Sequence, residues 1–297
     1  MKKFILLCFI LFLTGILYKY SDGIKDRIKE ISVSSSEQLI NGEAGVLMDE
    51  NSGEILYAKN ANERLFPAST TKILTALIAL NKGNMNDTVH IGDEVTLREP
   101  DESSAGLKPG QNLSLKVLLR AMLLPSGNDA ARSVAVYVAK KESNNPHMSS
   151  KEALDYFAQL MNQEANRIGA THSHFVNPHG LHNPNHYSTA KDLALIAREA
   201  RKNSEFREIV SEEMYKDASH TYYNRNELVN RGSQNYYQGA NGIKTGFTDQ
   251  AGYCLVSSAS RNGKNLIAVV LHSTNSDVWS DSTAMLEYGF EEKYVSK

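Results

Sequence analysis

The stretch PASTTKILTALIALNKG, residues 67–83, decides how this chain folds. Its apolar residues surround the helical axis instead of lining one face, which is typical of a helix buried on most sides. Pro67 and Ala68 lead into this helix, so Ser69 is predicted at its start. We therefore expect a central helix with a serine at its first turn.

Ser69 and Lys72 form a Ser-x-x-Lys pattern in this helix. Positions i and i+3 share a helical face, so Lys72 is expected to lie beside the Ser69 hydroxyl and to accept its proton when the amine is neutral. Burial and a second nearby cation both disfavour the ammonium form. Backbone N–H groups at the helix start favour a developing oxyanion. The pattern predicts a nucleophile and its base.

A second motif, Ser126-Gly-Asn128, lies on a predicted tight turn between two helices. We expect Ser126 to relay protons between Lys72, the nucleophile and the leaving amine. The side chain of Asn128 is expected to hydrogen-bond the backbone of a substrate. The motif therefore adds polar groups from a second part of the fold.

The third motif, Lys244-Thr245-Gly246, occurs once and lies in a predicted edge strand. Lys244 and Thr245 present a charge and a hydroxyl to a substrate carboxylate, and an extended substrate can pair with the strand. Lys244 also supplies the second cation that keeps Lys72 neutral, and Gly246 lets an acyl chain approach. In this order, the three motifs predict a serine acyl-transfer site.

Ser-x-x-Lys recurs at Ser188 to Lys191, and we interpret this copy as structural. It precedes the predicted helix DLALIARE, and Thr189 with Asp192 three residues later resembles a capping box.

The remaining patterns predict an α/β protein of the α+β type. Residues 44–60 predict two strands joined by a turn at residues 51–53. Three later strands, with an Asn-Gly turn between the last two, are predicted at residues 242–248, 252–260 and 265–273. Further helices are predicted at residues 113–124, 128–141, 152–168, 190–202 and 280–288. Together they imply a mainly antiparallel central sheet of about five strands flanked by helices.

Residues 1–20 are predicted to be a signal peptide or an N-terminal membrane anchor, because two lysines precede the apolar run at residues 4–18. This run is at the short end for a spanning helix, and no small-x-small cleavage site follows it, so these two features leave open whether the segment is cleaved. We favour an uncleaved anchor. Residues 21–39 suit a linker, and residues 40–297 a catalytic domain. The chain is thus expected outside the cytoplasm, at the outer face of the cell membrane or, if the signal is cleaved, secreted.

Composition excludes some partners and groups. Of 297 residues 22% are charged, the formal net charge is -2, and Lys and Arg are scattered, so no nucleic-acid partner is expected. The two cysteines are Cys8, in the leader, and Cys254, interpreted as a core residue, so the domain has no structural disulfide. Five histidines between His172 and His186 raise a zinc hypothesis, but HExxH is absent and Asn-Pro pairs indicate a loop. We expect no metal and no cofactor.

The runs PASTTKILTAL, LLPSGNDAA, NPHGL and GIKTGFTDQAGYCLVSSA resemble serine-type D-alanyl-D-alanine carboxypeptidases, the low-molecular-mass penicillin-binding proteins of peptidase family S11. The resemblance spans about residues 44–290. It implies the penicillin-recognising fold, a central sheet with an all-helical lobe. It also implies removal of the terminal D-alanine from peptidoglycan stem pentapeptides, with β-lactam antibiotics as covalent inhibitors.

By motif, the resemblance implies a role for each site residue. These are the nucleophile Ser69, the base Lys72, the second-lobe pair Ser126 and Asn128, the strand residues Lys244, Thr245 and Gly246, the oxyanion N–H groups of Ser69 and Phe247, and Arg225 at the substrate carboxylate. Phe247 stands where some relatives have His. Many relatives also carry a C-terminal β-rich domain, which is not expected here because the chain ends at Lys297.

Two alternatives remain at this stage. A class A β-lactamase shares Ser-x-x-Lys and Lys-Thr-Gly but adds a glutamate for deacylation, and its Glu-x-x-Leu-Asn pattern is absent between Asn128 and Lys244. A non-catalytic β-lactam sensor or wall-binding module would keep the same polar groups without turning over. Repeated turnover distinguishes the second alternative from an enzyme.

Overall fold

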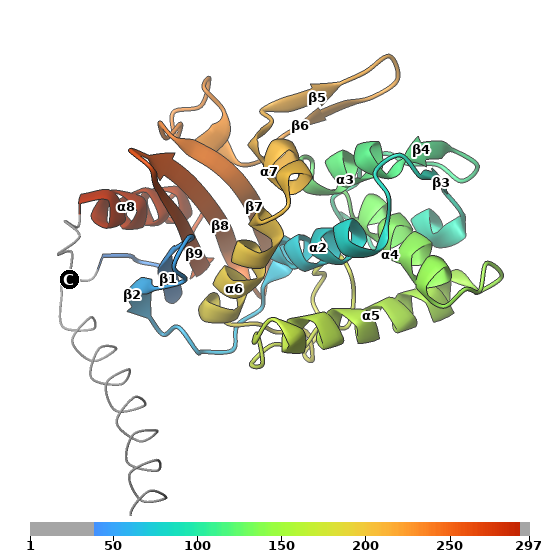
Figure 1. Ribbon diagram of the computed structural model, residues 1–297, viewed down its shortest axis with the longest axis horizontal. Coiled ribbons are helices and arrows are strands. Elements are labelled where there is room, and N and C mark those ends of the chain that lie inside the picture. Colours follow the sequence, from blue (N-terminus) through green and yellow to red (C-terminus); the bar gives the residue numbers. More distant parts are fainter. Residues whose placement is uncertain (1–38, 292–297) are drawn as a thin grey trace, which may run out of the picture. The chain divides into compact units, whose positions relative to one another are not determined.

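The computed structural model describes residues 39–291 (Figure 1). The predicted signal or anchor and almost all of the predicted linker lie outside the described residues. Among the described residues, no helix is both long and apolar enough to cross a membrane.

A five-stranded antiparallel sheet forms one part of the fold, with the strand order β2-β1-β9-β8-β7. Its strands are β1 (Ala44–Asp49), β2 (Ile55–Lys59), β7 (Ala240–Thr248), β8 (Gly252–Arg261) and β9 (Lys264–Ser273). The two ends of the domain meet where β1 pairs with β9, with Val46 opposite Val269. The predicted antiparallel sheet is confirmed, and β7 lies at its edge.

Helices cover both faces of this sheet (Figure 1). α8 (Asp277–Glu291) packs on β8 and β9, and α6 (Ala190–Arg201) packs on β9 and β1 from the other side. Every residue of β1 is therefore buried, so the alternation of apolar residues in the sequence does not mark a solvent-facing side of this strand.

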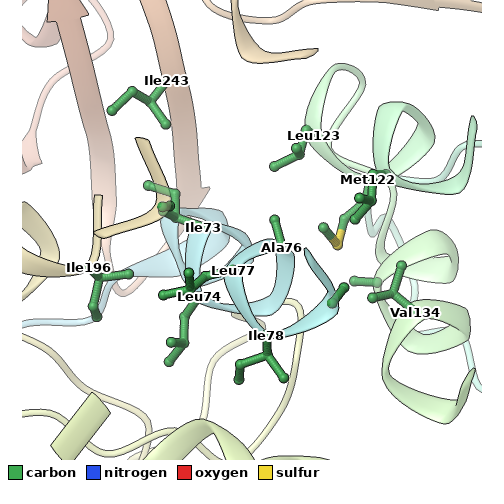
Figure 2. Packing of buried hydrophobic residues seen from close by; sticks show 14 of the residues in the cluster. Ile73, Leu74, Ala76, Leu77, Ile78, Met122, Leu123, Val134, Ile196 and Ile243 are labelled. Atoms are coloured by element: carbon green, nitrogen blue, oxygen red, sulfur yellow. The ribbon is translucent and has the colours of Figure 1, made fainter. Parts of the chain in front are cut away.

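The second part of the fold is helical. It contains α3 (Leu115–Leu123), α4 (Asn128–Glu142) and α5 (Ser150–Arg167). Between this lobe and the sheet lies α2 (Lys72–Lys82), whose first eight residues are all buried. Figure 2 shows Ile73 on the side of Ile243 and Ile196, and Ala76 on the side of Met122 and Leu123. The prediction of a central helix buried on most sides is confirmed.

The start of this helix differs from the prediction by one turn. Ser69 lies in the 3-10 turn η1 (Ala68–Thr71), and the α-helix begins only at Lys72. The backbone N–H and the hydroxyl of Thr70 both donate to the Pro67 carbonyl, at 3.2 and 2.7 Å. These bonds tighten the chain into a turn of shorter repeat before the α-helix can propagate.

Several short elements have no counterpart in the sequence prediction. They are β3 (Thr88–His90), η2 (Asp93–Thr96), β4 (Asn112–Ser114), α7 (Ser204–Ser211), β5 (Met214–Lys216), β6 (Thr221–Tyr223) and η3 (Glu227–Val229). Three residues are too few to establish a period, so such strands leave no pattern in the sequence. The helix α7 packs on β7 and supports the edge strand.

Candidate active site

The amine of Lys72 lies among three oxygen atoms. Its Nζ is 2.8 Å from Ser69 Oγ, 2.6 Å from Asn128 Oδ1 and 2.8 Å from the backbone oxygen of His179. The amide and backbone oxygens only accept, so they take the two N–H groups of a neutral amine. The lone pair is then directed at Ser69 Oγ, and the serine hydroxyl donates to it. This geometry suits a base and its nucleophile.

The electrostatic surroundings of Lys72 favour the neutral amine. Its side chain has no exposed surface, and burial is the largest cause that holds the pKa of Lys72 well below its usual value. The positive charge of Lys244 is the second cause and acts in the same direction, while Glu102 opposes both. These are the two causes that the sequence suggested.

Lys244 is itself buried, on the edge strand β7. Its Nζ donates to the Thr245 backbone oxygen at 3.0 Å. Burial, followed by the charge of Arg225, lowers the pKa of Lys244 to about 7. Its positive charge is therefore present below neutral pH and is lost as the pH rises through about 7.

A cleft of about 1260 Å³ lies over this pair of lysines. The predicted residues that line it are Ser69, Ser126, Asn128, Arg225, Thr245, Gly246 and Phe247. They come from η1, from the turn before α4 and the first residue of α4, from the loop after β6 and from β7. The structure thus brings every predicted site residue to this cleft or directly beneath it.

Ser126 faces the cleft, but it is not hydrogen-bonded to the base. Within the described part of the chain, Lys72 donates to or accepts from Ser69, Asn128 and the backbone of His179. The backbone of Ser126 has a φ of 66°, in the left-handed region, at the turn between α3 and α4. The relay through Ser126 remains a prediction.

Arg225 and Phe247 occupy two walls of the cleft. Arg225 Nη1 donates to Ser103 Oγ at 2.8 Å, so its guanidinium faces the site from the helical side. Phe247 is 50% exposed, and its ring centroid lies 4.5 Å from that of Tyr253. The predicted carboxylate and oxyanion roles of these two residues are compatible with their places but are not tested by them.

Gly246 has a packing role in addition to the predicted one, which stays a prediction. A Cβ at this position would lie 3.0 Å from the Ser69 backbone nitrogen and 3.0 Å from the Pro67 oxygen. Such contacts are tighter than those of ordinary packing. The absent side chain therefore allows β7 to approach the turn that carries the nucleophile.

The loop of residues 176–186 supports α2 from below. The Pro178 oxygen accepts from Thr75 Oγ1 at 2.7 Å, next to the His179 oxygen that accepts from Lys72. His186 Nδ1 accepts from the Val176 N–H, so Nε2 carries the proton and donates to Thr71 Oγ1 at 2.8 Å. Burial lowers the pKa of His186 to about 3, so the ring stays neutral.

The histidine-rich loop thus has a structural role in supporting α2, which sequence reasoning missed. Among residues 39–291, no group of three or more His, Cys, Asp or Glu side chains is placed to hold a metal ion. The Asn-Pro-His-Gly-Leu run was the available signal, but a backbone oxygen leaves no mark in residue type. Cys254 is buried as expected, and burial raises its pKa to about 12.

The second Ser-x-x-Lys motif, Ser188 to Lys191, has a structural role. Ser188 is buried and its Oγ lies 2.8 Å from Ser173 Oγ. Thr189 caps α6 by accepting from the Asp192 N–H at 3.0 Å. The predicted capping box is wrong in its second half, because the Asp192 carboxylate accepts instead from His172 N and Ser173 Oγ.

The family model for D-alanyl-D-alanine carboxypeptidases, peptidase S11, matches residues 31–275. The chain belongs to this family of serine peptidases. Among its relatives is a D-alanyl-D-alanine carboxypeptidase of Streptomyces sp. (strain K15), 35% identical over 263 residues that cover 83% of this chain and 86% of that protein. The carboxypeptidase DacF of Bacillus subtilis (strain 168) is 32% identical and is covered to 66% of its length, with 89% of this chain aligned.

Solved structures agree with the sequence comparison. The crystal structure of the Streptomyces K15 DD-transpeptidase has a TM-score of 0.77 at 33% identity, over 85% of this chain and 98% of that one. The D-alanyl-D-alanine carboxypeptidase DacD from Francisella tularensis has a TM-score of 0.73 at 28% identity, over 85% and 71%. The expected fold, that of the D-alanyl-D-alanine carboxypeptidase family, is therefore confirmed. This chain spans only about two thirds of the length of DacF.

Two glycines in the left-handed region provide a test of the supporting loop. A Cβ on Gly180 (φ 88°) would lie 1.8 Å from the Ala68 oxygen, whereas a Cβ on Gly169 (φ 85°) would have nothing within 4 Å. We expect Gly169→Ala to cost about 1 kcal/mol of stability, because only the backbone conformation is penalised. Gly180→Ala should in addition displace the turn that carries Ser69 and slow its acylation by fluorescent penicillin roughly 10²-fold. Equal acylation rates of the two folded variants would contradict the supporting role of the loop.

Proposed function

We propose that this protein is a serine-type D-Ala-D-Ala carboxypeptidase that acts on peptidoglycan stem pentapeptides and is acylated by β-lactams. The observation that carries the proposal is the buried Lys72 amine, whose Nζ lies 2.8 Å from Ser69 Oγ and within hydrogen-bonding distance of the Asn128 and His179 oxygens. Family membership supports the same class of substrate. No cofactor takes part in the steps below.

Acylation begins when Lys72 accepts the Ser69 proton and the serine oxygen attacks the carbonyl carbon between the two D-alanines. The backbone N–H groups of Ser69 and Phe247 receive the oxyanion. The terminal D-alanine leaves after its nitrogen gains a proton, which Lys72 supplies directly or through Ser126. An ester between the shortened peptide and Ser69 remains.

Deacylation repeats the steps with water as the nucleophile. Water takes the place of D-alanine and attacks the ester carbon while Lys72 accepts its proton. The bond to Ser69 Oγ then breaks, Lys72 returns the proton to that oxygen, and a tetrapeptide and free Ser69 are released. In the preceding acylation step, before the terminal D-alanine leaves, its carboxylate is held on the cleft wall by Arg225 and the Thr245 hydroxyl. Lys244 lies behind that wall and contributes its charge.

The site of action follows from the substrate. Peptidoglycan lies outside the cytoplasmic membrane, and residues 1–20 have the composition of an export signal or anchor. The chain is exported through this segment and held at the outer face of the membrane. Expression of the full chain should therefore place penicillin-labelled protein in the membrane fraction. Labelled protein mainly in the culture medium would indicate cleavage instead.

The function is tested by giving the full-length protein a muramyl pentapeptide and, separately, excess benzylpenicillin. We expect repeated release of D-alanine from the peptide, but one stoichiometric burst with penicillin. The opened β-lactam stays attached beside the ester and obstructs water, whereas D-alanine departs after peptide cleavage. Ser69→Ala should abolish both reactions, and Ser188→Ala should retain them, because Ser188 is buried and its hydroxyl is paired with that of Ser173.

Other outcomes separate the alternatives. Sustained penicillin hydrolysis without D-alanine release would indicate a β-lactamase, and labelling without turnover of either compound a sensor. Labelling that survives Ser69→Ala would show that another residue is the nucleophile. Product that couples to an added amine in place of water would assign transpeptidation, the activity named for the Streptomyces K15 structure.

The two lysines should give separable defects. Lys72→Ala removes the base and should reduce acylation roughly 10²–10⁴-fold at every pH.

In the wild type, kcat/KM should fall as the pH rises through about 7, because Lys244 then loses its proton and the carboxylate loses an attractive charge. Lys244→Arg should raise KM but move this alkaline limb to higher pH, since a guanidinium stays protonated. Steady-state kinetics from pH 5 to 10 check this, and an unmoved limb would show that Lys244 does not cause it.

A further inference from the structure

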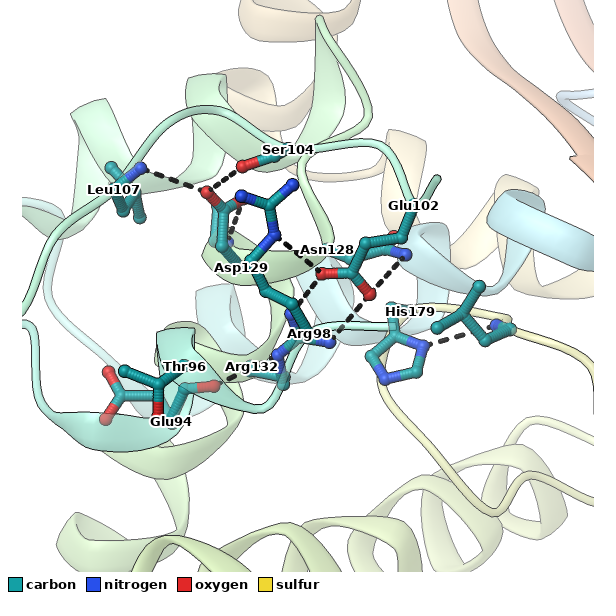
Figure 3. Close-up of polar contacts among 12 residues, drawn as sticks. Glu94, Thr96, Arg98, Glu102, Ser104, Leu107, Asn128, Asp129, Arg132 and His179 are labelled. Carbon is teal, nitrogen blue, oxygen red and sulfur yellow. Dashed lines mark hydrogen bonds and ion pairs between the residues drawn. The ribbon is translucent and has the colours of Figure 1, made fainter. Parts of the chain in front are cut away.

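Behind the site lies a buried ion pair between Glu102 and Arg132 (Figure 3). The Glu102 side chain has no exposed surface and that of Arg132 is 2% exposed. Arg132 Nη1 donates to Glu102 Oε2 at 3.1 Å, Nη2 donates to Oε1, and Nε donates to the Glu94 oxygen at 3.1 Å. The guanidinium thus fixes both oxygens of the carboxylate.

One of these oxygens also faces the active site. Glu102 Oε2 accepts from Asn128 Nδ2 at 3.4 Å, while Asn128 Oδ1 lies 2.6 Å from Lys72 Nζ. A flipped amide would set an oxygen against the carboxylate and an N–H group against the amine of Lys72. The contact with the carboxylate would then lose its hydrogen bond in a buried place, which is costly, and the amide N–H would compete with the Ser69 hydroxyl for the lone pair of Lys72. The carboxylate therefore dictates which end of Asn128 meets the base.

The segment that carries Glu102 is anchored to the same turn. The Ser103 oxygen accepts from the Asn128 N–H at 2.8 Å. The Asp129 carboxylate accepts from Ser104 Oγ at 2.6 Å and from the Leu107 N–H at 3.0 Å. Backbone and side-chain contacts thus hold Glu102 at a fixed distance from Asn128.

We propose that Glu102, held by Arg132, is a positioning residue that orients the Asn128 amide for proton transfer between Ser69 and Lys72. With the amide in this orientation, its oxygen occupies one N–H group of the amine, and the lone pair remains directed at the serine. The inference rests on the proposed function, since that function assigns Lys72 as the base. It adds a residue that acts on the base through Asn128.

Glu102 also has an electrostatic effect that can be measured apart from its geometry. The charged and titratable groups around Lys72 are Lys244, Glu102, Arg225, Arg132, His179 and His186. The negative charge of Glu102 favours the ammonium form and so raises the pKa of Lys72 against the other causes. Removing that charge should shift the acid limb of the acylation rate to lower pH.

The experiment compares two double variants of the full-length protein, Glu102→Gln/Arg132→Met and Glu102→Met/Arg132→Met. Both lack the ion pair and leave no unpaired buried charge, but only the first keeps an oxygen for Asn128 Nδ2. The second-order rate of Ser69 acylation by fluorescent penicillin is measured from pH 5 to 10. We expect the Gln variant to stay near the wild-type rate and the Met variant to fall roughly tenfold or more.

Single variants provide a second, independent measurement. Glu102→Asp keeps the charge but withdraws the oxygen, so it should lower the rate without moving the acid limb. Glu102→Gln should move that limb to lower pH. As a control, Glu50→Gln neutralises another ion pair, in which Arg201 Nε lies 2.9 Å from Glu50 Oε2, and should leave the acylation rate and its pH profile unchanged.

The outcomes distinguish this inference from the proposed function. Equal rates for the two double variants, or a full rate for Glu102→Asp, would overturn the positioning role. If either double variant does not fold, the comparison of the single variants Glu102→Asp and Glu102→Gln decides. A wild-type protein that is acylated by penicillin but releases no D-alanine would overturn the carboxypeptidase function and leave the role of Glu102 in acylation standing.

Discussion

The amine of Lys72 is buried among oxygen atoms, and the rest of the site is arranged around that fact. An ammonium without solvent is costly, whereas a neutral amine can be buried if its two N–H groups and its lone pair all find partners. The three partners come from different segments, namely the turn before α2, the start of α4 and the loop of residues 176–186. The base is therefore a product of the tertiary fold, because no single element supplies its environment.

The position of α2 explains why these segments meet. The helix lies between the sheet and the helical lobe, so its first turn is reached by β7 from one side and by the turn before α4 from the other. The absence of side chains at Gly246 and Gly180 lets β7 and the loop of residues 176–186 approach the turn that carries Ser69. A substrate that pairs with the edge strand β7 would then lie across the nucleophile. The cleft is the gap between the two parts of the fold, with the reactive pair at its floor.

Much of this could be predicted from the sequence, for reasons that are local. The i, i+3 spacing placed Ser69 beside Lys72, and it did so even though the turn is 3-10, because residues three apart are close in either helix. Alternation and the Asn-Gly turn predicted the hairpin of β8 and β9. The contacts of Lys72 with the His179 oxygen and of Glu102 with Asn128 could not be predicted. They join segments that are far apart, and the participating loops have no period and no motif that marks a backbone acceptor.

The charges around Lys72 affect its pKa, whereas the packing around it sets the direction of its lone pair. Lys244, Arg225 and Arg132 lower its pKa and Glu102 raises it, but burial exceeds each of them. Removing one charge therefore shifts the pKa of the amine and with it the pH range in which the amine accepts a proton. Moving one of the three oxygens changes where the lone pair is directed, and a misdirected lone pair is of no use at any pH. Packing thus decides whether Lys72 is a base, and the surrounding charges decide over which pH range it acts.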